Sequence, residues 1–397
     1  MPERFRYCVR MISWSNSQLP THSPFSHDYT PPRKMGLGVI GLGEGRSIVS
    51  AAVSSRLWTL VNICDLNTEL IAERKKEFGL ECPGTTRMEE LLVDPAIDAI
   101  AIYTPDALHA QHIRSTLEAG KHVICTKPLI TDLSHGPSLL AAARAAGCQV
   151  LVGQSSRFIH PMWRQREDVV NGLHGALTAV EAHYFGDHRW FYTKPWTRGE
   201  GVNEVFQGLS HAVDLVRWHL PDIEEVMGYG LSTRHARALG QINPDALHFV
   251  MKTRSGELAR VSGHYGQLTL ANKAQDMIQC IVRGTEGVSI ANFAQLNYQR
   301  RIMENGQAVE REEDFSAWHP YYWRFGGHSH HAGEFQNYLD HLARSLHEKT
   351  LARPDLRDGL RTVATLEAMN RSVKTGQPQR VSAVLAEFGL PELCGPV

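Results

Sequence analysis

Short apolar runs alternate with amphipathic stretches over the first part of the chain. The runs lack polar alternation, which is typical of strands buried on both faces, and the stretches between them carry apolar residues at helical spacing. Strands that alternate with helices predict βαβ units and a parallel sheet, with ligands at its carboxyl edge. The predicted strands are residues 37–41, 58–64, 98–103, 121–125 and 149–153, and the predicted helices are residues 67–78, 107–119 and 134–146.

Beyond residue 153 the pattern changes to strands that are separated by turn residues. Pairs such as Arg283-Gly284 and Glu286-Gly287 are typical turn signals. The predicted strands here are residues 176–185, 223–231, 246–253, 257–265 and 277–283.

Residues 1–34 show neither period and contain five prolines. Three early arginines are followed by no apolar segment, so a secretory signal is not supported. We interpret this segment as a disordered or non-native extension.

Composition narrows the function classes. The chain has 397 residues with 41 Lys and Arg against 42 Asp and Glu, which argues against partners that need a global basic field: nucleic acid or a membrane surface. No apolar run approaches the ~18 residues of a transmembrane helix. The seven cysteines form no C-x-x-C pair, so we expect a reducing, cytoplasmic location.

Two overlapping glycine strings surround the end of the first predicted strand. Gly36, Gly38 and Gly41 match G-x-G-x-x-G, but they lie within the strand, whereas this motif forms the turn after it. That turn is residues 41–46 (G-L-G-E-G-R), whose third glycine comes one place early. Its N–H groups and those of the following helix would face a pyrophosphate. The predicted dinucleotide contacts are Gly41, Leu42, Gly43, Gly45 and Arg46.

Asp65 ends the second predicted strand, near the ~20-residue spacing at which a carboxylate binds a ribose 2′-hydroxyl. A carboxylate there repels a 2′-phosphate, so NAD is the expected cofactor and NADP the less favoured one. The alternative interpretation is a plain glycine turn followed by an aspartate that caps a helix.

Three further stretches resemble the Gfo/Idh/MocA oxidoreductases, the family of glucose-fructose oxidoreductase and inositol dehydrogenase. Residues 102–109 (I-Y-T-P-D-A-L-H) are similar to the exit of the family's fourth strand. Residues 120–129 resemble its G-K-H-V-x-x-E-K-P motif, with Thr126 in place of Glu, and residues 153–161 resemble the start of its second domain. Weaker similarity follows at Glu334-Phe335, Tyr338-Leu339, residues 358–360 and residues 372–376.

The resemblance covers about residues 36–380 and implies an α/β fold: an N-terminal Rossmann domain with a doubly wound parallel sheet, then an α/β domain with a large, open, mainly antiparallel sheet. We expect the Rossmann domain over residues 35–153, a substrate and oligomerisation domain over 154–385, and a tail over 386–397. The open sheet implies a homodimer or homotetramer. The resemblance adds these cofactor contacts: Thr104, Pro105, His109, Thr126, Lys127 and Gln154.

Lys127 is the first candidate catalytic residue. It precedes Pro128, which favours an extended backbone, and at a strand's carboxyl edge its ammonium would hydrogen-bond the hydroxyl that is oxidised. The alternative is a surface lysine.

Residues 207–214 resemble the family's D-x-G-x-H-x-x-D helix, which implies His211 as general acid/base and Asp214 as a positioning group. Gln207 stands where the first Asp is usual and cannot carry a proton, so the Lys-Asp-His relay is incomplete. Seven residues before His211, Glu204 is predicted on the same helix face, and we hypothesise that it supplies the missing carboxylate. The alternative for His211 is a structural histidine beside the sheet.

An aromatic and basic run over residues 184–198 suits a polyhydroxylated ring, or a carboxylate or phosphate on the substrate; the alternative is an exposed loop. A histidine-rich run over residues 318–334 contains metal-ligand types, but adjacent histidines point to different faces. We expect no metal there and instead a partial lining of the substrate cleft, or surface polar groups. The expected substrate contacts are Lys127, Arg157, Arg189, Trp190, Asp214 and His328.

The expected function is an NAD-dependent oxidoreductase acting on a carbinol of a sugar, inositol or related cyclic polyol. Lys127 would bind the oxygen and His211 would move the proton. One alternative is a glycosidase or lyase that uses retained NAD transiently, without net redox. Another is a non-catalytic regulator that senses NAD.

Overall fold

The computed structural model describes residues 25, 28–193, 202–266, 268, 270, 277–325 and 331–395. These residues form two compact units. The parallel-sheet unit comprises the described residues up to Phe158 together with His319–Leu360, and the mixed-sheet unit comprises Ile159–Trp318 and the residues from Arg361 onward. Most of the expected N-terminal extension lies outside the described residues.

The parallel-sheet unit contains six parallel strands in the order β3-β2-β1-β4-β5-β6, the order of a Rossmann fold. Every residue of β1 and β4 is buried, which explains their continuous apolar sequence. The order reverses between β1 and β4, which places the ligand-binding crevice of such sheets at that point. The strands are β1 (Met35–Ile40), β2 (Trp58–Cys64), β3 (Gly84–Thr85), β4 (Ala99–Ile102), β5 (His122–Thr126) and β6 (Val150–Gly153).

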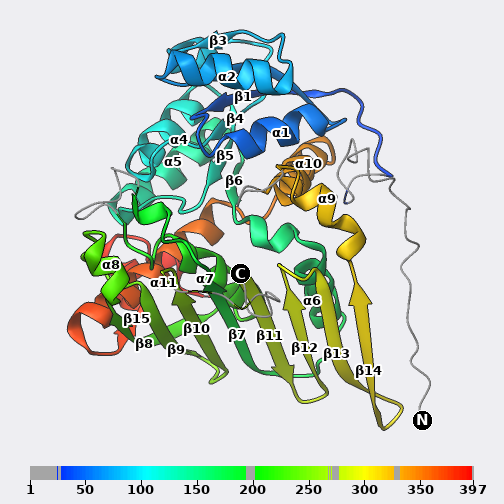
Figure 1. The fold of residues 1–397 in the computed structure, drawn as a ribbon, viewed down its shortest axis with the longest axis vertical. Helices are drawn as coiled ribbons and strands as arrows, with labels where there is room; N and C mark the ends of the chain where they lie inside the picture. Colours follow the sequence, from blue (N-terminus) through cyan, green and yellow to red (C-terminus); the bar gives the residue numbers. More distant parts are fainter. Residues whose placement is uncertain are drawn as a thin grey trace. The chain divides into compact units, whose positions relative to one another are not determined.

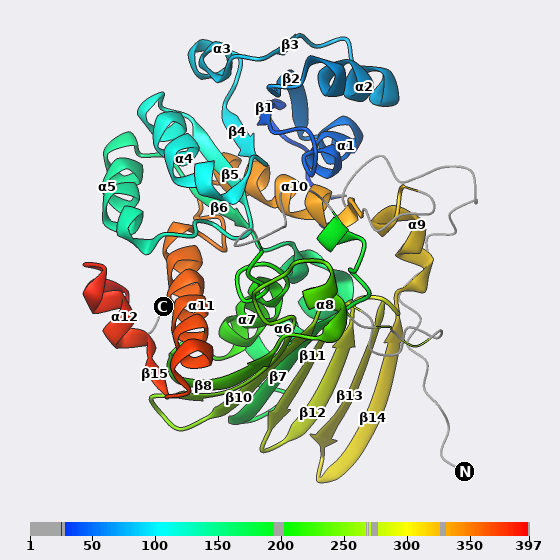
Figure 2. The same ribbon diagram turned by 60° about the vertical axis from the view of Figure 1, so that its left-hand side comes forward.

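Helices cover both faces of this sheet. Figures 1 and 2 show α4 and α5 on one face and α1, α2 and α10 on the other. Asn67 caps α2 by accepting from two backbone N–H groups, and Gly79 ends that helix in the left-handed conformation. The helices are α1 (Arg46–Ser54), α2 (Thr68–Phe78), α3 (Met88–Val93), η1 (Asp106–Leu108), α4 (His109–Glu118), η2 (Leu133–His135), α5 (Gly136–Ala146) and η3 (Ser155–Phe158).

Two later helices, α9 (His319–Tyr322) and α10 (Gly333–His347), also belong to the parallel-sheet unit. We expected these residues in the second domain. The reason for the difference is packing: α10 buries one face along α1, and the indole Nε1 of Trp58 donates to the carbonyl of Leu339 at 2.9 Å. Helix α10 therefore completes the core of the parallel-sheet unit, although it comes later in the chain.

The mixed-sheet unit contains nine strands in the order β14-β13-β12-β11-β7-β10-β9-β8-β15. Only β7 and β10 pair in parallel; all other described pairs are antiparallel. The five predicted strands are found, and the sequence did not indicate β12 to β15. The bounds are β7 (Leu177–Phe185), β8 (Ile223–Leu231), β9 (Ala246–Thr253), β10 (Leu258–His264), β11 (Met277–Gly284), β12 (Gly287–Asn292), β13 (Asn297–Glu304), β14 (Gln307–Asp314) and β15 (Gln379–Arg380).

Helices lie against one face of the mixed sheet, as Figure 2 shows for α6, α7 and α11. The opposite face presents exposed apolar side chains from β8, β9 and β10, among them Tyr229, Leu231, Val250 and Leu258. No helix of the described residues is long and apolar enough to cross a membrane. The helices are α6 (His160–Val170), η4 (Phe191–Thr193), α7 (Gly208–His219), α8 (Arg234–Ala238), η6 (Ser316–Trp318), α11 (Leu356–Thr375), α12 (Val381–Glu387) and η7 (Pro391–Leu393).

Candidate functional site

The predicted cofactor residues follow the carboxyl ends of five neighbouring strands. The glycine turn follows β1, Asp65 follows β2, and Thr104 comes two residues after β4. Lys127 follows β5, and Gln154 follows β6. Because the carboxyl ends of parallel strands meet at one edge, the fold gathers these residues along the edge at which α/β proteins bind ligands.

The glycine turn is built from three glycines with different roles. Gly41 has a φ of +83°, and a Cβ there would lie 2.5 Å from the carbonyl oxygen of Tyr103. A Cβ on Gly45 would lie 2.0 Å from the carbonyl oxygen of Gly41, whereas one on Gly43 would meet nothing within 4 Å. Gly45 therefore provides the close packing that the third glycine of the motif supplies elsewhere, and Arg46 begins α1.

Asp65 is bound to the turn. Its Oδ2 accepts from the N–H of Leu42 at 2.8 Å, and its Oδ1 accepts from the N–H of Asn67 at 2.9 Å. The carboxylate thus fixes both the glycine turn and the approach to α2. Arg46, also predicted to bind the cofactor, directs its guanidinium toward α2 and donates from Nε to Glu77 at 2.7 Å.

These residues fit a dinucleotide. The open space over Gly43 is where a phosphate could approach the backbone, and α1 begins with no side-chain cap and no acidic residue in its first turn. The partial positive charge at that helix end is therefore not offset by a protein carboxylate in the turn of the helix. Asp65 offers carboxylate oxygens suited to ribose hydroxyls.

The exits of β4 and β5 are joined by His109, whose ring is fully buried. Its Nδ1 lies 2.8 Å from the carbonyl oxygen of Pro128, and its Nε2 lies 2.9 Å from the carbonyl oxygen of Thr104. The hydroxyl of Thr104 lies 2.9 Å from Nδ1 of His112. His109 thus links the segment after β4 to the segment after β5, next to Lys127.

Lys127 and its neighbours form the remainder of that exit. Thr126 is the last residue of β5, Lys127 is half-buried, and its bond to Pro128 is cis. Pro105 precedes the short helix η1.

A pair made of a half-buried histidine and a fully buried glutamate lies in electrostatic range of Lys127. Nδ1 of His331 contacts Oε1 of Glu334, whose side chain is fully buried. Burial alone would lower the pKa of His331, but the Glu334 carboxylate and Glu44 outweigh burial and raise it, while Lys127 opposes them. This pair was not singled out from the sequence, where it was one part of a histidine-rich run.

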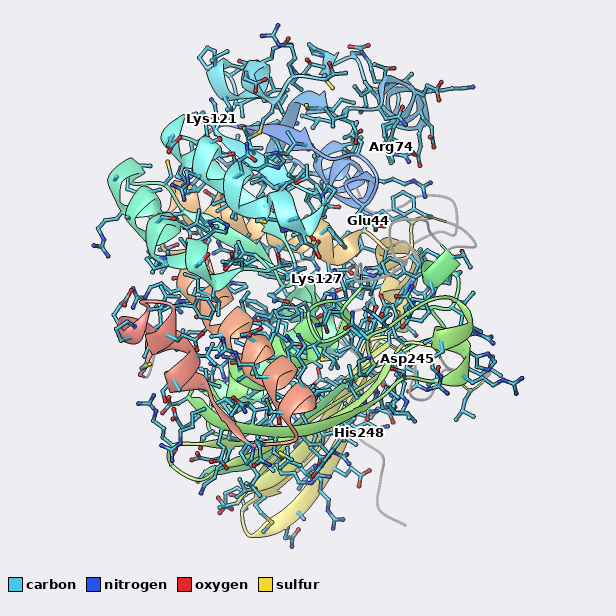
Figure 3. The ribbon with its side chains drawn as sticks, turned by 90° about the vertical axis from the view of Figure 1, so that its left-hand side faces the viewer. Glu44, Arg74, Lys121, Lys127, Asp245 and His248 are labelled. Carbon is cyan, nitrogen blue, oxygen red and sulfur yellow. The ribbon has the colours of Figure 1, made fainter. Side chains whose placement is uncertain are left out.

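Gln154 and Arg157 are both buried, at 2% and 6% exposure, and the N–H of Arg157 donates to the carbonyl of Gln154 at 3.2 Å. Arg157 lies in η3 of the parallel-sheet unit. Figure 3 marks Glu44, Arg74 and Lys127 on this unit.

In the mixed-sheet unit, His211 lies in the first turn of α7 and its ring stacks on Tyr184 of β7, with centroids 5.7 Å apart and planes 14° apart. Gly208 starts the helix, and a Cβ there would lie 2.8 Å from the Tyr184 ring and 2.9 Å from the Tyr265 ring. A glycine is therefore needed for the helix to approach the two tyrosines. The imidazole consequently has a defined orientation.

The prediction that Glu204 and His211 share a helix face is wrong. Helix α7 begins at Gly208, so Glu204 lies in the preceding turn and shares no helix face with His211. Glu204 is buried, and its Oε1 accepts from the hydroxyl of Tyr192 at 2.9 Å. Burial and the Glu204 carboxylate raise the pKa of Tyr192. Gln207 is the residue before the helix and makes no side-chain cap.

Two of the predicted substrate residues, Arg189 and Trp190, lie in the segment after β7, and ring contacts run from Trp190 through His188 and Tyr184 to His211. Arg189 forms a two-bond ion pair with Asp187, at 2.6 Å for each bond, and the neighbouring Trp190 is 43% exposed. Asp214 is buried on α7 at 1% exposure. His328, with Trp196 and Arg198, lies outside the described residues.

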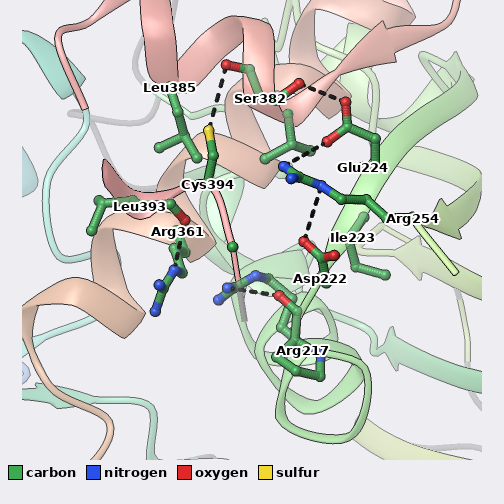
Figure 4. A pocket seen from close by; sticks show the side chains of 13 residues that line it. Arg217, Asp222, Ile223, Glu224, Arg254, Arg361, Ser382, Leu385, Leu393 and Cys394 are labelled. Carbon is green, nitrogen blue, oxygen red and sulfur yellow. Dashed lines mark hydrogen bonds and ion pairs between the residues drawn. The ribbon is translucent and has the colours of Figure 1, made fainter. Parts of the chain in front are cut away.

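In the described part of the chain, neither a metal-binding cluster nor the detected pocket coincides with the predicted site residues. Among the described residues no three His, Cys, Asp or Glu side chains are grouped to hold a metal. A small pocket in the mixed-sheet unit lies between β8, α12 and the C-terminal segment, with Arg217, Arg254 and Cys394 in its wall (Figure 4). None of the predicted site residues lines this pocket, which has room for little more than a water molecule.

Two family models match the chain. One, described as an oxidoreductase family with an NAD-binding Rossmann fold, matches residues 35–154. The other, described as an oxidoreductase family C-terminal α/β domain, matches residues 167–381.

Curated relatives are dehydrogenases. An inositol 2-dehydrogenase of Rubrobacter xylanophilus is 26% identical over 364 residues, 88% of this chain and 94% of the relative. A levoglucosan dehydrogenase of Pseudarthrobacter phenanthrenivorans is 23% identical over 314 residues, 70% of this chain and 79% of the relative. A 1-carboxy-3-chloro-3,4-dihydroxycyclohexa-1,5-diene dehydrogenase of Comamonas testosteroni is 30% identical over 190 residues, and this match spans about half of each protein, 46% and 47%.

Solved structures share the fold. A levoglucosan dehydrogenase in complex with NADH and levoglucosan has a TM-score of 0.73 at 20% identity, covering 88% of this chain and 100% of that one. An oxidoreductase from Agrobacterium radiobacter in complex with NAD+, L-tartaric acid and magnesium has a TM-score of 0.76 at 17% identity, covering 89% and 100%.

Proposed function

Because the chain belongs to the Gfo/Idh/MocA oxidoreductase family, we propose that it is an NAD-dependent oxidoreductase of a sugar, inositol or related cyclic polyol. The observation that carries the proposal is the carboxyl edge of the parallel sheet, where the open glycine turn, the Asp65 carboxylate and Lys127 lie at adjacent strand exits. Bound NAD supplies the hydride acceptor. The names of the inositol and levoglucosan dehydrogenases support the substrate class.

Each residue has a defined task in the proposed reaction. The Lys127 ammonium donates a hydrogen bond to the carbinol oxygen and stabilises negative charge that develops there as the hydroxyl proton leaves. His211 accepts that proton at its imidazole, which Tyr184 holds in a fixed plane. Trp190 offers an exposed indole face for the C–H face of a sugar ring.

NAD is proposed over NADP because Asp65 directly follows β2, the place from which a carboxylate binds the ribose hydroxyls of NAD in folds of this type. Its two oxygens already accept backbone N–H groups, so its carboxylate is fixed in place before the cofactor binds. A fixed negative charge there disfavours a 2′-phosphate.

We also propose a homo-oligomer formed through the exposed face of the mixed sheet, where Tyr229 and Leu231 are 70% and 63% exposed. Light scattering coupled to size-exclusion chromatography tests it: the protein should elute as a dimer or tetramer. A monomer at micromolar concentration would contradict it. The proposed compartment is the cytoplasm, since the six described cysteines are all free thiols.

The enzymatic proposal is tested with purified protein in two steps. NADH binding is measured first by fluorescence, and then NADH formation is followed with a panel of sugars and inositols. We expect binding and turnover of at least one polyol, with turnover lost in Lys127→Met. If NADH does not bind, the proposed cofactor is wrong. If NADH binds but no polyol is turned over, the proposed substrate class is wrong.

A further inference from the structure

One carboxylate, that of Glu77 on α2, bridges two arginines beside the glycine turn. Its Oε1 accepts from Nε of Arg46 at 2.7 Å, and its Oε2 accepts from Nη1 of Arg74. Arg46 is the first residue of α1, and its guanidinium also lies over the ring of Phe325, 4.1 Å from the centroid. Glu77 therefore connects the start of α1 to α2.

The same cluster leads directly to Asp65. Nε of the buried Arg74 donates to the carbonyl of Leu42 at 3.2 Å, and the N–H of Leu42 donates to Asp65 at 2.8 Å. A single residue of the turn, Leu42, thus separates the arginine cluster from the Asp65 carboxylate. A guanidinium is the side-chain group best suited to pair with a phosphate, so the state of these two arginines bears on whether a 2′-phosphate is accepted.

Charge decides what these arginines can bind. Arg46 and Arg74 carry two positive charges, while Glu77, Glu73 and Asp65 carry three negative ones. The two arginines are thus neutralised by two carboxylates of α2. The remaining charge belongs to Asp65.

We propose that Glu77 determines the choice between NAD and NADP, because it holds Arg46 away from the ribose and cancels its charge. This inference rests on the proposed dinucleotide site. Replacing Glu77 frees Arg46, for which the other described contact is the Phe325 ring, whereas Arg74 keeps Glu73 and the Leu42 carbonyl. The freed guanidinium can then reach a 2′-phosphate.

The test compares binding of 2′,5′-ADP and 5′-AMP to the full-length protein by calorimetry. We expect Glu77→Gln to tighten 2′,5′-ADP binding about tenfold or more, the effect of one hydrogen bond to a charged group, and to leave 5′-AMP within about twofold. NADPH binding should improve by the same factor.

Glu73→Gln is the matched control. It removes the same charge from the same helix, Arg74 is the partner of Glu73 among the described residues, and the Glu73 side chain is 64% exposed. Its ratio of 2′,5′-ADP to 5′-AMP affinity should stay within about twofold of the wild type, since screening weakens an exposed charge. An equal gain in both variants would show a general charge effect and overturn the proposal.

Two more variants separate this role from a structural one. Adding Arg46→Gln to Glu77→Gln should abolish the gain, and Glu77→Asp, whose shorter side chain cannot bridge both arginines, should show a smaller gain in the same direction. A lower melting temperature with an unchanged affinity ratio in both Glu77 variants would overturn the proposal. Failure of the wild type to bind NADH would instead overturn the proposed function.

Discussion

The imidazole of His109 and the carbonyl of Pro128 are joined at 2.8 Å in the interior of the parallel-sheet unit. Because the other ring nitrogen is bound to Thr104, one side chain fixes the exits of two neighbouring strands. Lys127 immediately precedes Pro128, so the position of the proposed catalytic ammonium depends on a histidine that lies on α4.

His109→Ala should therefore lower both stability and turnover. The buried carbonyl of Pro128 and the part-buried carbonyl of Thr104 lose their partner, at about 1–3 kcal/mol in the free energy of unfolding for the buried one, and Lys127 loses its fixed backbone. Urea denaturation and kcat measure the two effects. His112 contacts the Thr104 hydroxyl and not Pro128. His112→Ala should therefore leave kcat within a factor of a few of the wild-type value. Equal kcat losses in both variants would refute the positioning role.

Two glycines of the turn, Gly43 and Gly45, should respond differently to alanine. Gly43→Ala meets no atom within 4 Å, so it should fold normally and lose NADH affinity, because the methyl group fills the space over the backbone. Gly45→Ala should unfold at lower temperature, since its Cβ would clash with Gly41. Melting temperature and NADH titration test both. Normal NADH affinity in a folded Gly43→Ala variant would contradict the proposal that a phosphate of the cofactor binds at this turn.

Lys127→Met should reduce kcat by about 10²–10⁴-fold, the range of a positioned proton-transfer or charge-stabilising group. NADH affinity should change little if the lysine acts on the substrate oxygen. Steady-state kinetics and NADH titration separate the two quantities. A loss confined to NADH binding would instead make Lys127 a cofactor ligand.

The role of Glu204 is tested by comparison with His211. His211→Ala should abolish turnover, because it removes the proposed proton acceptor. Glu204→Gln keeps an acceptor for the Tyr192 hydroxyl and should preserve the fold. If it also keeps wild-type kcat, Glu204 is a structural partner of Tyr192 and supplies no catalytic carboxylate.

The pair His331 and Glu334 should make stability depend on pH. The pKa of His331 is raised in the folded protein, so its contribution is complete below the unfolded value of about 6.5 and is lost as pH rises through the folded value. The difference in melting temperature between wild type and Glu334→Gln should therefore be largest near pH 6 and shrink as the pH rises through the raised pKa of His331. A difference that grows with pH would contradict this assignment.

Sequence patterns predicted the strands that are apolar or that alternate cleanly, and β2, β8 and β9 agree with the predicted bounds to the residue. They did not indicate β14, whose sequence Q-A-V-E-R-E-E-D is mostly charged because it lies at the sheet edge. The β-propensities of amino acids describe strands that are half-buried in a sheet. An edge strand carries charged residues instead, so these propensities do not predict it.

At the site, the sequence indicated residues whose role follows from their place after a strand, such as Gly41, Asp65 and Lys127. It could not indicate contacts between distant segments. Arg46 and Glu77 are 31 residues apart, and nothing in either local pattern shows that they meet. The start of α7 was also missed, because residues 202–207 form a turn without glycine or proline.

The charged strand β14 limits how copies of this protein can join. A sheet edge normally offers unpaired backbone groups on which another chain can add a strand, but here acidic side chains such as Glu310 and Glu312 line one end, and the two-residue β15 forms the other. Like charges would repel an identical strand placed alongside. The proposed contact between copies would therefore form through the broad exposed face of the sheet and not by addition of a strand at an edge.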